Sequence, residues 1–412
     1  MHVVETLRPR SESELQSAIA SLARQGHPAE VRGAGSKRGI GRPTQLPAVI
    51  EMTGINGISL YEPTELVMTA LAGTSLAQVE TTLAERGQML AFEPMDLGPA
   101  TGGAGGVQTM GAVFATNISG ARRIQSGAAR DHLLGVRGVN GRGETFKSGG
   151  RVLKNVTGYD VARALTGSWG TLAVLSEVTF KVLPKPKQTE TLVYVGLSDE
   201  IAAELACFAL GTPFEVSGTA HLTAGLTSRL EQRSLAREAS TLTAIRIENF
   251  ESSIAYRSDK LTEALKIYGA PQRLGHDTSV QFWSELRRLS VMTPLKGEAA
   301  THLWRISTAP ILAAKVIGAI RRNMSAEAYY DASGGMIWLE VLASADAGAA
   351  DIRRILSSHG GHATLMRAEP EVRASVEVFQ PMSAVVERLS RGIKESFDPS
   401  GILNPGRMFA AW

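Results

Sequence analysis

Cysteine is nearly absent from this sequence, since Cys207 is the only one among 412 residues. A single thiol cannot form a disulfide within the chain, and it cannot hold an iron–sulfur cluster, which needs several thiolate ligands. If electrons leave this protein through iron–sulfur chemistry, a partner must hold the clusters. We expect a cytoplasmic protein.

The sequence also lacks a strong excess of charge and a long apolar run. Lys and Arg total 43 against 40 Asp and Glu, a balance that disfavours a nucleic-acid partner or a membrane surface, although the isoelectric point is near 9.0. The amino terminus is charged within its first five residues, so we expect no signal peptide. The apolar segment 309–320 is too short for a transmembrane span. Any association with the inner membrane would therefore be made through partners.

Glycine is abundant, and the stretch "RGAGSKRGIG" at 32–41 resembles a phosphate-binding loop. A nucleotide-triphosphate P-loop needs Gly-Lys-Ser/Thr at the start of a helix, whereas this stretch has the order Gly35-Ser36-Lys37 and no helical pattern after it. A dinucleotide-binding turn also runs into a helix, which Pro43 and Pro47 exclude here. Two interpretations remain: a nest of backbone N–H groups that binds an anion, and an ordinary surface turn.

The periodicity of the chain predicts an α+β protein of more than one domain. A capping box at Ser11 opens a helix that ends at Gly26, and strand and helix patterns continue to about residue 87. Residues 98–131 show no sustained helical period and are expected to form loops, before a hairpin at 132–150 and a long strand that ends at Pro184. The segment 184–191, "PKPKQTET", is the best candidate for a linker.

The order of elements in 302–367 is strand, helix, strand, strand, helix, strand, which is the ferredoxin-like motif. Residues 191–269 could be a degenerate partner of this unit. An amphipathic helix and the terminal "NPGRM" close the chain. We therefore predict domains at 1–186 and 187–385, and a helix and tail at 386–412.

Several motifs in the first 186 residues and the tail occur in a characteristic order. They are "RGAGSKRGIG", "TMGAVFATNISGARR", "GAARDHLLGVRGVNGRGE", "LKNVTGYDVARALTGSWGTLAVLSEVTFKVLP" and "NPGRM". Together they resemble the FAD-binding domain of the p-cresol methylhydroxylase and vanillyl-alcohol oxidase type, near the D-lactate and D-2-hydroxyacid dehydrogenases. Within that superfamily the chain is similar to the smaller, E-type FAD-binding subunits of bacterial glycolate oxidases. Over 187–390 the similarity is one of length and layout alone.

The resemblance implies a two-subdomain FAD-binding domain followed by a ferredoxin-like cap, with FAD held non-covalently. The two glycine loops would enclose the pyrophosphate and ribityl chain, a later turn would pass the adenine, and the tail would return toward the flavin ring. The residues implied are Gly33, Ala34, Gly35, Ser36, Lys37, Pro94, Thr109, Met110, Gly111, Thr116, Asn117, Gly120, Gly170, Val174 and Asn404. His132 is expected to have a packing role and not to tether the flavin.

The resemblance also implies partners, namely a catalytic FAD subunit and an iron–sulfur subunit that together oxidise glycolate to glyoxylate. Two alternatives stay open: a self-sufficient D-2-hydroxyacid dehydrogenase, and a scaffold that has lost the cofactor. Catalytic relatives carry a paired-histidine metal motif on the cap, whereas the corresponding hairpin here, "AYYDASGGMIWLEV", has no histidine.

Candidate substrate-binding residues on the cap are correspondingly few, namely Arg246, Arg305, Tyr329, Tyr330 and Asp331. Arg246 and Arg305 lie in predicted strands and could bind a carboxylate, although Arg246 could equally pair with Glu248. Tyr329 and Tyr330 would point to opposite faces of a strand, so that one of them could reach the flavin. The "HGGH" at 359–362 has no acidic third ligand beside it, and we predict no metal site. The pairs Lys154-Asn155 and Tyr159-Asp160 are expected to hold the FAD domain together.

Overall fold

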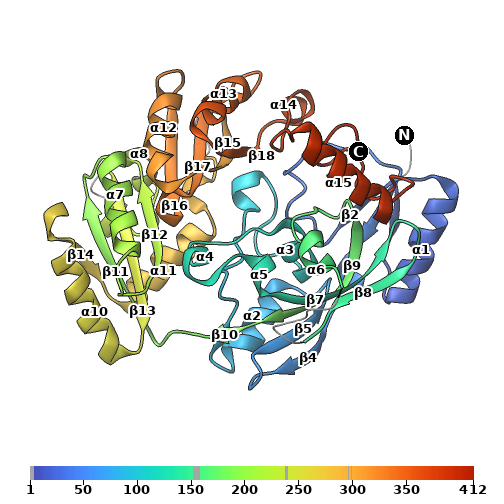
Figure 1. Ribbon diagram of the computed structural model, residues 1–412, viewed down its shortest axis with the longest axis horizontal. Helices are drawn as coiled ribbons and strands as arrows, with labels where there is room; N and C mark the ends of the chain where they lie inside the picture. The colour runs from blue at the N-terminus through green and yellow to red at the C-terminus, as the bar shows by residue number, and fades with distance from the viewer. Residues whose placement is uncertain (1–3, 152–157, 237–239, 296, 298) are drawn as a thin grey trace.

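The structure is a computed structural model that describes residues 4–151, 158–236, 240–295, 297 and 299–412. Figure 1 shows two lobes side by side, with the cap on the left and the amino-terminal part on the right. The Lys154-Asn155 pair lies outside the described residues. Tyr159 is 93% exposed, and Asp160 caps helix α6 (Val161–Leu165) by accepting a hydrogen bond from the N–H of Arg163.

The first subdomain is a small parallel sheet covered by one helix. Its strands run in the order β1 (Glu5–Leu7), β3 (Ala48–Glu51), β2 (Ala29–Arg32). Helix α1 (Glu12–Gln25) begins and ends where the sequence predicts: Ser11 accepts from the N–H of Glu14 at 3.1 Å, and Gly26 closes it with φ 64°. Its leucines and isoleucine pack into the core of this layer.

The second subdomain is a five-stranded antiparallel sheet. Its order is β4 (Ile58–Glu62), β5 (Val67–Leu71), β9 (Ala173–Lys181), β7 (Leu133–Asn140), β8 (Thr145–Gly149). The predicted hairpin is thus β7–β8, and the predicted long strand is β9. Short strands β6 (Gln88–Met89) and β10 (Leu183–Pro184) pair beside it, and α2 (Leu76–Ala84) packs in the same core with Phe92, Phe114 and Phe180.

The loop prediction for 98–131 is wrong in part, because short helices form there. They are η2 (Pro99–Thr101), α3 (Met110–Thr116), α4 (Arg123–Ser126) and α5 (Ala129–His132). Helix α3 lasts only seven residues and ends when Asn117 adopts a left-handed conformation with φ 52°. A helix of two turns gives too little periodicity to read from sequence.

The cap contains one eight-stranded antiparallel sheet built from two halves of the same topology. The order is β14-β11-β13-β12-β16-β17-β15-β18, so each half has the ferredoxin-like arrangement and β12 pairs with β16 at the junction. The second half confirms the motif predicted at 302–367, and the first half is the partner that the sequence only suggested. The elements of the first half are β11 (Gln188–Val195), α7 (Asp199–Leu210), β12 (Val216–Leu222), β13 (Leu242–Asn249), α10 (Glu251–Ala264) and β14 (Gln272–Leu274); those of the second are β15 (Thr301–Ser307), α12 (Ala313–Arg321), β16 (Ala326–Asp331), β17 (Met336–Leu342), α13 (Ala349–His359) and β18 (His362–Arg367).

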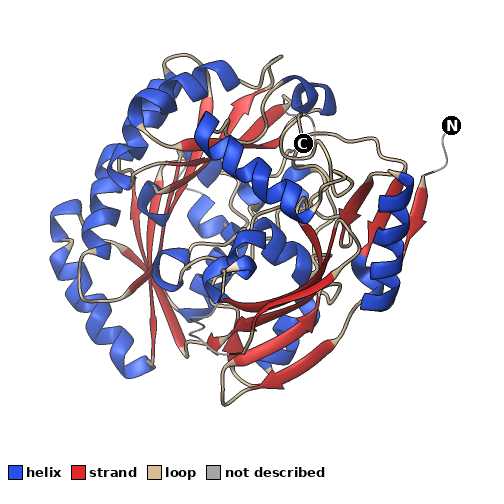
Figure 2. Cartoon of the chain, turned by 45° about the vertical axis from the view of Figure 1, so that its right-hand side comes forward, coloured by secondary structure: helices blue, strands red, loops and turns tan. Residues whose placement is uncertain are grey.

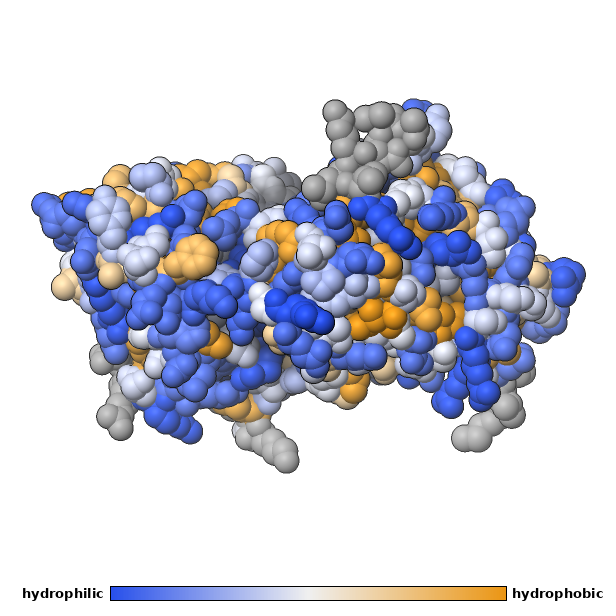
Figure 3. All heavy atoms as spheres, turned by 90° about the horizontal axis from the view of Figure 1, so that it is seen from below, coloured by the Kyte–Doolittle hydropathy of each residue, from blue (hydrophilic) through white to orange (hydrophobic). Residues whose placement is uncertain are grey.

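Strand β11 contains half of the predicted linker. Shorter elements complete the described chain. These are η1 (Met52–Gly54), α8 (Ala224–Thr227), α9 (Arg233–Ala236), η3 (Lys266–Tyr268), α11 (His276–Arg287), η4 (Ser290–Met292), η5 (Pro310–Leu312), η6 (Ala332–Gly334), α14 (Pro370–Ser375) and α15 (Ala384–Phe397). None of the helices formed by the described residues is both long and apolar enough for a membrane span. On the face in Figure 3, hydrophilic residues surround several small hydrophobic patches.

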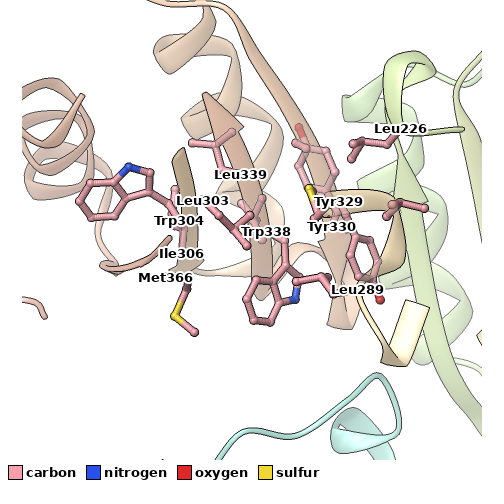
Figure 4. Close-up of a cluster of buried hydrophobic side chains, with 14 of the residues drawn as sticks. Leu226, Leu289, Leu303, Trp304, Ile306, Tyr329, Tyr330, Trp338, Leu339 and Met366 are labelled. Atoms are coloured by element: carbon pink, nitrogen blue, oxygen red, sulfur yellow. The ribbon is translucent and has the colours of Figure 1, made fainter. Parts of the chain in front are cut away.

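The two faces of the large sheet have different surroundings. Most cap helices lie along its outer side (Figure 2). Trp304 belongs to that side, where its indole N–H donates to the carbonyl of Ala347. Figure 4 shows Tyr329 and Tyr330 pointing to opposite sides of β16, as predicted from strand geometry, and Trp338 pointing to the side of Tyr329. This second face is turned toward the amino-terminal lobe.

The tail returns to the first subdomain, as the predicted layout requires. Leu403 forms an isolated parallel bridge with Ala29, the first residue of β2. The side chain of Asn404 accepts from the N–H of Val31 at 2.8 Å and donates to the carbonyl of Trp169 at 2.8 Å. One residue of the tail therefore ties together two segments that lie more than a hundred positions apart in the sequence.

Candidate functional site

A hollow that is open to solvent lies between the first glycine loop, helix α3 and the turn before β9. Ten of the fifteen residues predicted to bind the cofactor line it, and they come from three separate parts of the chain. They are Gly33, Ala34, Gly35, Ser36, Lys37, Thr109, Gly111, Thr116, Gly170 and Val174. The structure thus brings the two predicted glycine loops together around one space.

The approach of the two loops depends on glycine at position 33. A Cβ atom on Gly33 would lie 2.1 Å from Oγ1 of Thr109, a distance that no side chain can occupy. In the same loop, Gly35 has φ 87°, which favours glycine, and the N–H groups of Ala34, Gly35 and Ser36 donate to no described residue. Small residues and free donors are what a backbone cradle for an anion requires.

A buried polar atom on the opposite loop has no partner. Oγ1 of Thr109 is shielded from solvent and makes no hydrogen bond within the described chain. Buried hydroxyls are normally satisfied, so an unpaired one at a hollow indicates a ligand atom that completes it. The donors on both loops therefore fit the pyrophosphate of FAD.

Two buried cationic side chains, Lys37 and Arg407, line the hollow, and neither is bonded to a carboxylate of a described residue. The ammonium of Lys37 donates to the side-chain oxygen of Gln108, and burial lowers its pKa to about 8 although Asp96 acts in the opposite direction. The guanidinium of Arg407 donates to the carbonyl of Lys37 at 2.8 Å, and burial lowers its pKa to about 10. A bound dianion would restore the stability that both cations lose by desolvation.

The other five predicted residues do not line the hollow, although several support its walls. Asn404 ties β2 to the turn at Trp169, and Met110 is fully buried in the core behind α3. Asn117 ends α3 and accepts from the N–H of Arg130 at 3.1 Å. The N–H of Gly120 donates to the carbonyl of Glu93 at 2.8 Å, and the carbonyl of Pro94 accepts from Arg287 at 2.7 Å. Their contact with a cofactor stays a prediction.

The sequence analysis missed several residues of the hollow. Arg407 lies three positions after Asn404 in the "NPGRM" motif, and Trp169 directly precedes Gly170, so both were adjacent to predicted positions. Glu30 and Arg38 form a two-point ion pair at the hollow, at 2.8 and 3.0 Å. Arg38, Trp169 and Arg407 lie inside the quoted motifs, and this position is the signal that could have identified them from sequence.

A second buried charge cluster joins the cap to the FAD-binding lobe. Both oxygens of Glu93 accept from Arg246, at 2.9 and 3.0 Å, and Arg246 also lies 3.4 Å from Glu248 and over the ring of Trp283. Arg122 bridges Glu248 and Glu93 from the same lobe as Glu93. Burial would raise the pKa of Glu93, but Arg246 and Arg122 outweigh it and lower the value to about 2. Arg246 therefore holds the two lobes together, and its guanidinium is already engaged by Glu93, Glu248 and Ser217.

Arg305 differs from Arg246, because its guanidinium bonds to none of the described residues. It is half-buried on β15, where it pairs with Trp338 of β17 and Thr364 of β18, so these side chains share the face toward the FAD-binding lobe. Burial and the charge of Arg123, from helix α4, lower the pKa of Arg305 to about 10. Arg305 therefore remains the candidate residue for binding a substrate carboxylate.

Tyr329 and Asp331 lie on the same face of the cap sheet. Tyr329 is 1% exposed, and burial raises the pKa of its hydroxyl well above the usual range. Burial and the nearby charge of Glu93 raise the pKa of Asp331 to about 7, although the N–H of Ala332 and Arg246 act in the opposite direction. A carboxyl group with such a pKa could exchange a proton near neutral pH. Asp331 is among the cap residues that the sequence offers, but the burial that raises its pKa is visible only in the structure.

The histidines that the sequence raised as candidates are His132 and the pair at 359 and 362. His132 is fully buried and its Nε2 lies 2.9 Å from the carbonyl of Ser126, which is the packing role predicted for it. His359 contacts the carbonyl of Ile355 at the end of α13, while His362 is exposed at the start of β18. Across the described ranges, no three His, Cys, Asp or Glu side chains are grouped to hold a metal.

Comparison with known proteins identifies the family. Residues 5–149 match a family described as an FAD binding domain. Over 386 residues the chain is 33% identical to the glycolate oxidase subunit GlcE of Escherichia coli (strain K12), with 93% of each chain covered. A solved structure of alkyldihydroxyacetonephosphate synthase has a TM-score of 0.71 at 15% identity, covering 97% of this chain and 75% of that one. The structure of p-cresol methylhydroxylase with substrate bound has a TM-score of 0.68 at 12% identity, covering 98% and 88%. The chain belongs to the FAD-linked oxidoreductases of the p-cresol methylhydroxylase and vanillyl-alcohol oxidase type, with an FAD-binding domain followed by a cap that carries a large antiparallel sheet.

Proposed function

We propose that this chain is the FAD-binding subunit of a glycolate oxidase or dehydrogenase complex that oxidises glycolate, a small 2-hydroxyacid, to glyoxylate. The observation that carries this proposal is the 33% identity to the Escherichia coli subunit over 93% of both chains. Its partners would be a catalytic FAD subunit and an iron–sulfur subunit, because the single cysteine cannot hold a cluster. The complex would act in the cytoplasm.

The residues of the hollow would hold FAD in a defined orientation. The N–H groups of the first glycine loop and the hydroxyl of Thr109 would donate to the pyrophosphate, and Lys37 and Arg407 would neutralise its charge. FAD, when bound, supplies a group that accepts a hydride from the substrate. The described residues around the hollow include no histidine or cysteine, which supports non-covalent binding.

The cap supports a limited role for this chain in the chemical step. The hairpin β16–β17 contains no histidine. Strand β16 ends at Asp331, whose carboxyl group is buried. We therefore infer that the chain binds FAD but oxidises little substrate without its partners.

The test is turnover of glycolate and D-lactate by the purified chain, with a dye as electron acceptor. We expect FAD to be released by acid denaturation, and negligible turnover until the partner subunits are added. Appreciable turnover by the single chain would contradict the inference that it oxidises little substrate without its partners. A colourless chain that stays colourless after incubation with FAD would instead indicate a scaffold.

A second candidate function, self-sufficient oxidation of a D-2-hydroxyacid, is favoured by the cap face. Arg305 has no bonded partner there, and Asp331 has a pKa of about 7. If this candidate is correct, Arg305→Met should raise the KM for the acid, whereas Asp331→Asn should lower kcat, in the single chain. Equal activity of both variants and the parent chain would eliminate this candidate.

A further inference from the structure

The face of the cap sheet that is turned toward the amino-terminal lobe, here called the inner face, carries a row of polar side chains. Trp338 of β17 pairs with Tyr329 of β16 on one side and with Arg305 of β15 on the other. Arg305 in turn pairs with Thr364 of β18. Residues that pair across antiparallel strands share one face and have Cβ atoms about 4.5–5.5 Å apart. These four side chains are therefore neighbours, and we call them the inner row.

Trp338 gives the clearest sign that the inner row lacks a partner. Its indole projects from β17 on the inner side (Figure 4), is 1% exposed, and has its Nε1 shielded from solvent with no acceptor among the described residues. On the opposite face, the indole N–H of Trp304 donates to the carbonyl of Ala347 at 2.8 Å. Buried donors are normally paired, and an indole N–H can only donate. The missing partner of Trp338 is therefore an acceptor that comes from another molecule.

The other members of the inner row are unpaired as well. The guanidinium of Arg305 and the hydroxyls of Tyr329 and Thr364 form no hydrogen bond with the part of the chain that the structure describes. One step along the strands, the side chains of Ser307 and His362 face each other by register and are also without a bonded partner in the described ranges. The patch thus gathers several kinds of hydrogen-bond donor in one place.

The charge around the inner row is positive. Arg305 is half-buried, and the charge of Arg123, on α4 of the amino-terminal lobe, adds to burial in lowering its pKa to about 10. Neither arginine forms an ion pair with a described residue. Partial burial and the charges of the same two arginines lower the pKa of His362. Two guanidinium groups that are held near each other without a counter-ion attract an anion.

Two carboxyl groups face the same patch, but neither of them pairs with these cations. Burial raises the pKa of Asp331 to about 7, so this group is mostly neutral below that pH. Both oxygens of Glu93 accept from Arg246, at 2.9 and 3.0 Å. Unpaired donors beside uncompensated positive charge fit a ligand with several acceptor atoms and a negative charge, which a carboxylate provides.

We propose that the inner row is a binding site for a small carboxylate of the 2-hydroxyacid or 2-oxoacid class, with the N–H of Trp338 and the guanidinium of Arg305 donating to it. The choice of acid rests on the proposed function, whereas the site itself rests on the unpaired donors. Binding there requires no oxidation by this chain. The subunit would therefore hold the anion even if all turnover takes place in a partner.

The test is calorimetric titration of the FAD-loaded chain with oxalate, a two-carbon anion that has no CH–OH group to oxidise. We expect one oxalate per chain, and no binding of the neutral analogue glycolamide. Arg305→Met and Trp338→Phe should each weaken oxalate binding about tenfold or more, because each removes a hydrogen bond to a charged group.

Trp304→Phe is the matched control, because it removes an indole N–H that is already bonded on the opposite face. It should lower the midpoint of thermal unfolding and leave oxalate binding unchanged. Trp338→Phe should do the reverse, since it removes a donor that has no partner in the free protein. Lys315→Met, at an exposed position of α12, should change neither quantity and is the control for Arg305→Met.

Three outcomes would overturn the proposal. The first is the absence of oxalate binding, and the second is an unchanged affinity in Trp338→Phe. The third is a loss of FAD affinity in these variants with normal oxalate binding, which would mean that the inner row contacts the flavin. Turnover by the single chain is a separate measurement, so failure of the proposed function and failure of this site give different results.

Discussion

The two groups of buried charges in this protein are neutralised in different ways. In the cluster between the lobes, Arg246 and Arg122 share the carboxylates of Glu93 and Glu248, so each charge has a partner within the chain. At the hollow, Lys37 and Arg407 are equally buried, but their bonded partners are an amide oxygen and a carbonyl. The charges between the lobes are neutralised within the chain, whereas the cations at the hollow are stabilised when an anion binds. Removing a charge from each group should therefore have opposite consequences.

The largest effect is expected from Glu93→Ala. This change leaves Arg246 buried without its two-point partner, and breaking a buried ion pair on one side costs about 3–5 kcal/mol. The free energy of unfolding in urea should fall by that amount, and Glu65→Ala, at an exposed turn, should leave it unchanged. A loss below about 1 kcal/mol would mean that the cluster does not hold the lobes together.

Lys37→Met should behave in the opposite way. It removes a desolvated cation, so the unfolding free energy of the FAD-free protein should stay constant or rise. The affinity for FAD should fall by about ten- to a hundredfold, as expected for the loss of a charge-assisted bond. Titration of the apoprotein with FAD, followed by flavin fluorescence, measures this, with Lys315→Met as the control. A variant that binds FAD normally would show that Lys37 does not face the cofactor.

The variant Asp331→Asn removes a buried carboxyl group near the charge cluster between the lobes. The pKa of Asp331 in the folded protein is about 7, above its unfolded value near 3.8, so ionisation destabilises the folded state. Wild-type stability should therefore decline as the pH rises from about 4 to about 7, and the variant should lack this decline. Above pH 7 the variant should be more stable by about 1–3 kcal/mol. Denaturation curves at pH 5 and pH 8 test this, and a pH-independent difference would contradict it.

The smallest effect is expected in the pH dependence of FAD binding. Lys37 has a pKa of about 8 in the free protein, and the bound pyrophosphate should raise it. Binding then takes up a proton above pH 8, so affinity should be flat below that value and fall by up to about tenfold per pH unit above it. Lys37→Met should lose this dependence. If the wild type has the same affinity at pH 7 and pH 9.5, the assignment of Lys37 is wrong.

Local sequence predicted the hollow better than the face of the cap. The two glycine loops could be recognised because their function requires small residues at consecutive positions, and Gly33 shows why: any side chain would strike Thr109. Helix α3 was missed because two turns give no clear period. Arg407 was missed although it stands in a motif that had already been noticed.

Of the charge cluster, local sequence predicted the Arg246–Glu248 pair and not the contact with Glu93. Glu93 and Arg246 are separated by 153 positions, and only the packing of the cap onto the other lobe brings them together. The same holds for Asp331, whose raised pKa depends on burial and on Glu93 and not on its neighbours in the sequence. The first half of the cap, by contrast, repeats the topology of the second, and its regular alternation of strands and helices gave a partial signal.

The return of the tail to β2 has a consequence for the order in which the protein matures. Asn404 and Arg407 are translated after both glycine loops, yet Asn404 joins Val31 to Trp169 and Arg407 lines the hollow. A nascent chain still on the ribosome has therefore already made both glycine loops but cannot close them around a ligand. We therefore expect the hollow to become competent for a cofactor only after the tail has docked, and a chain cut before Asn404 to bind flavin more weakly than the full chain even if its first lobe had folded.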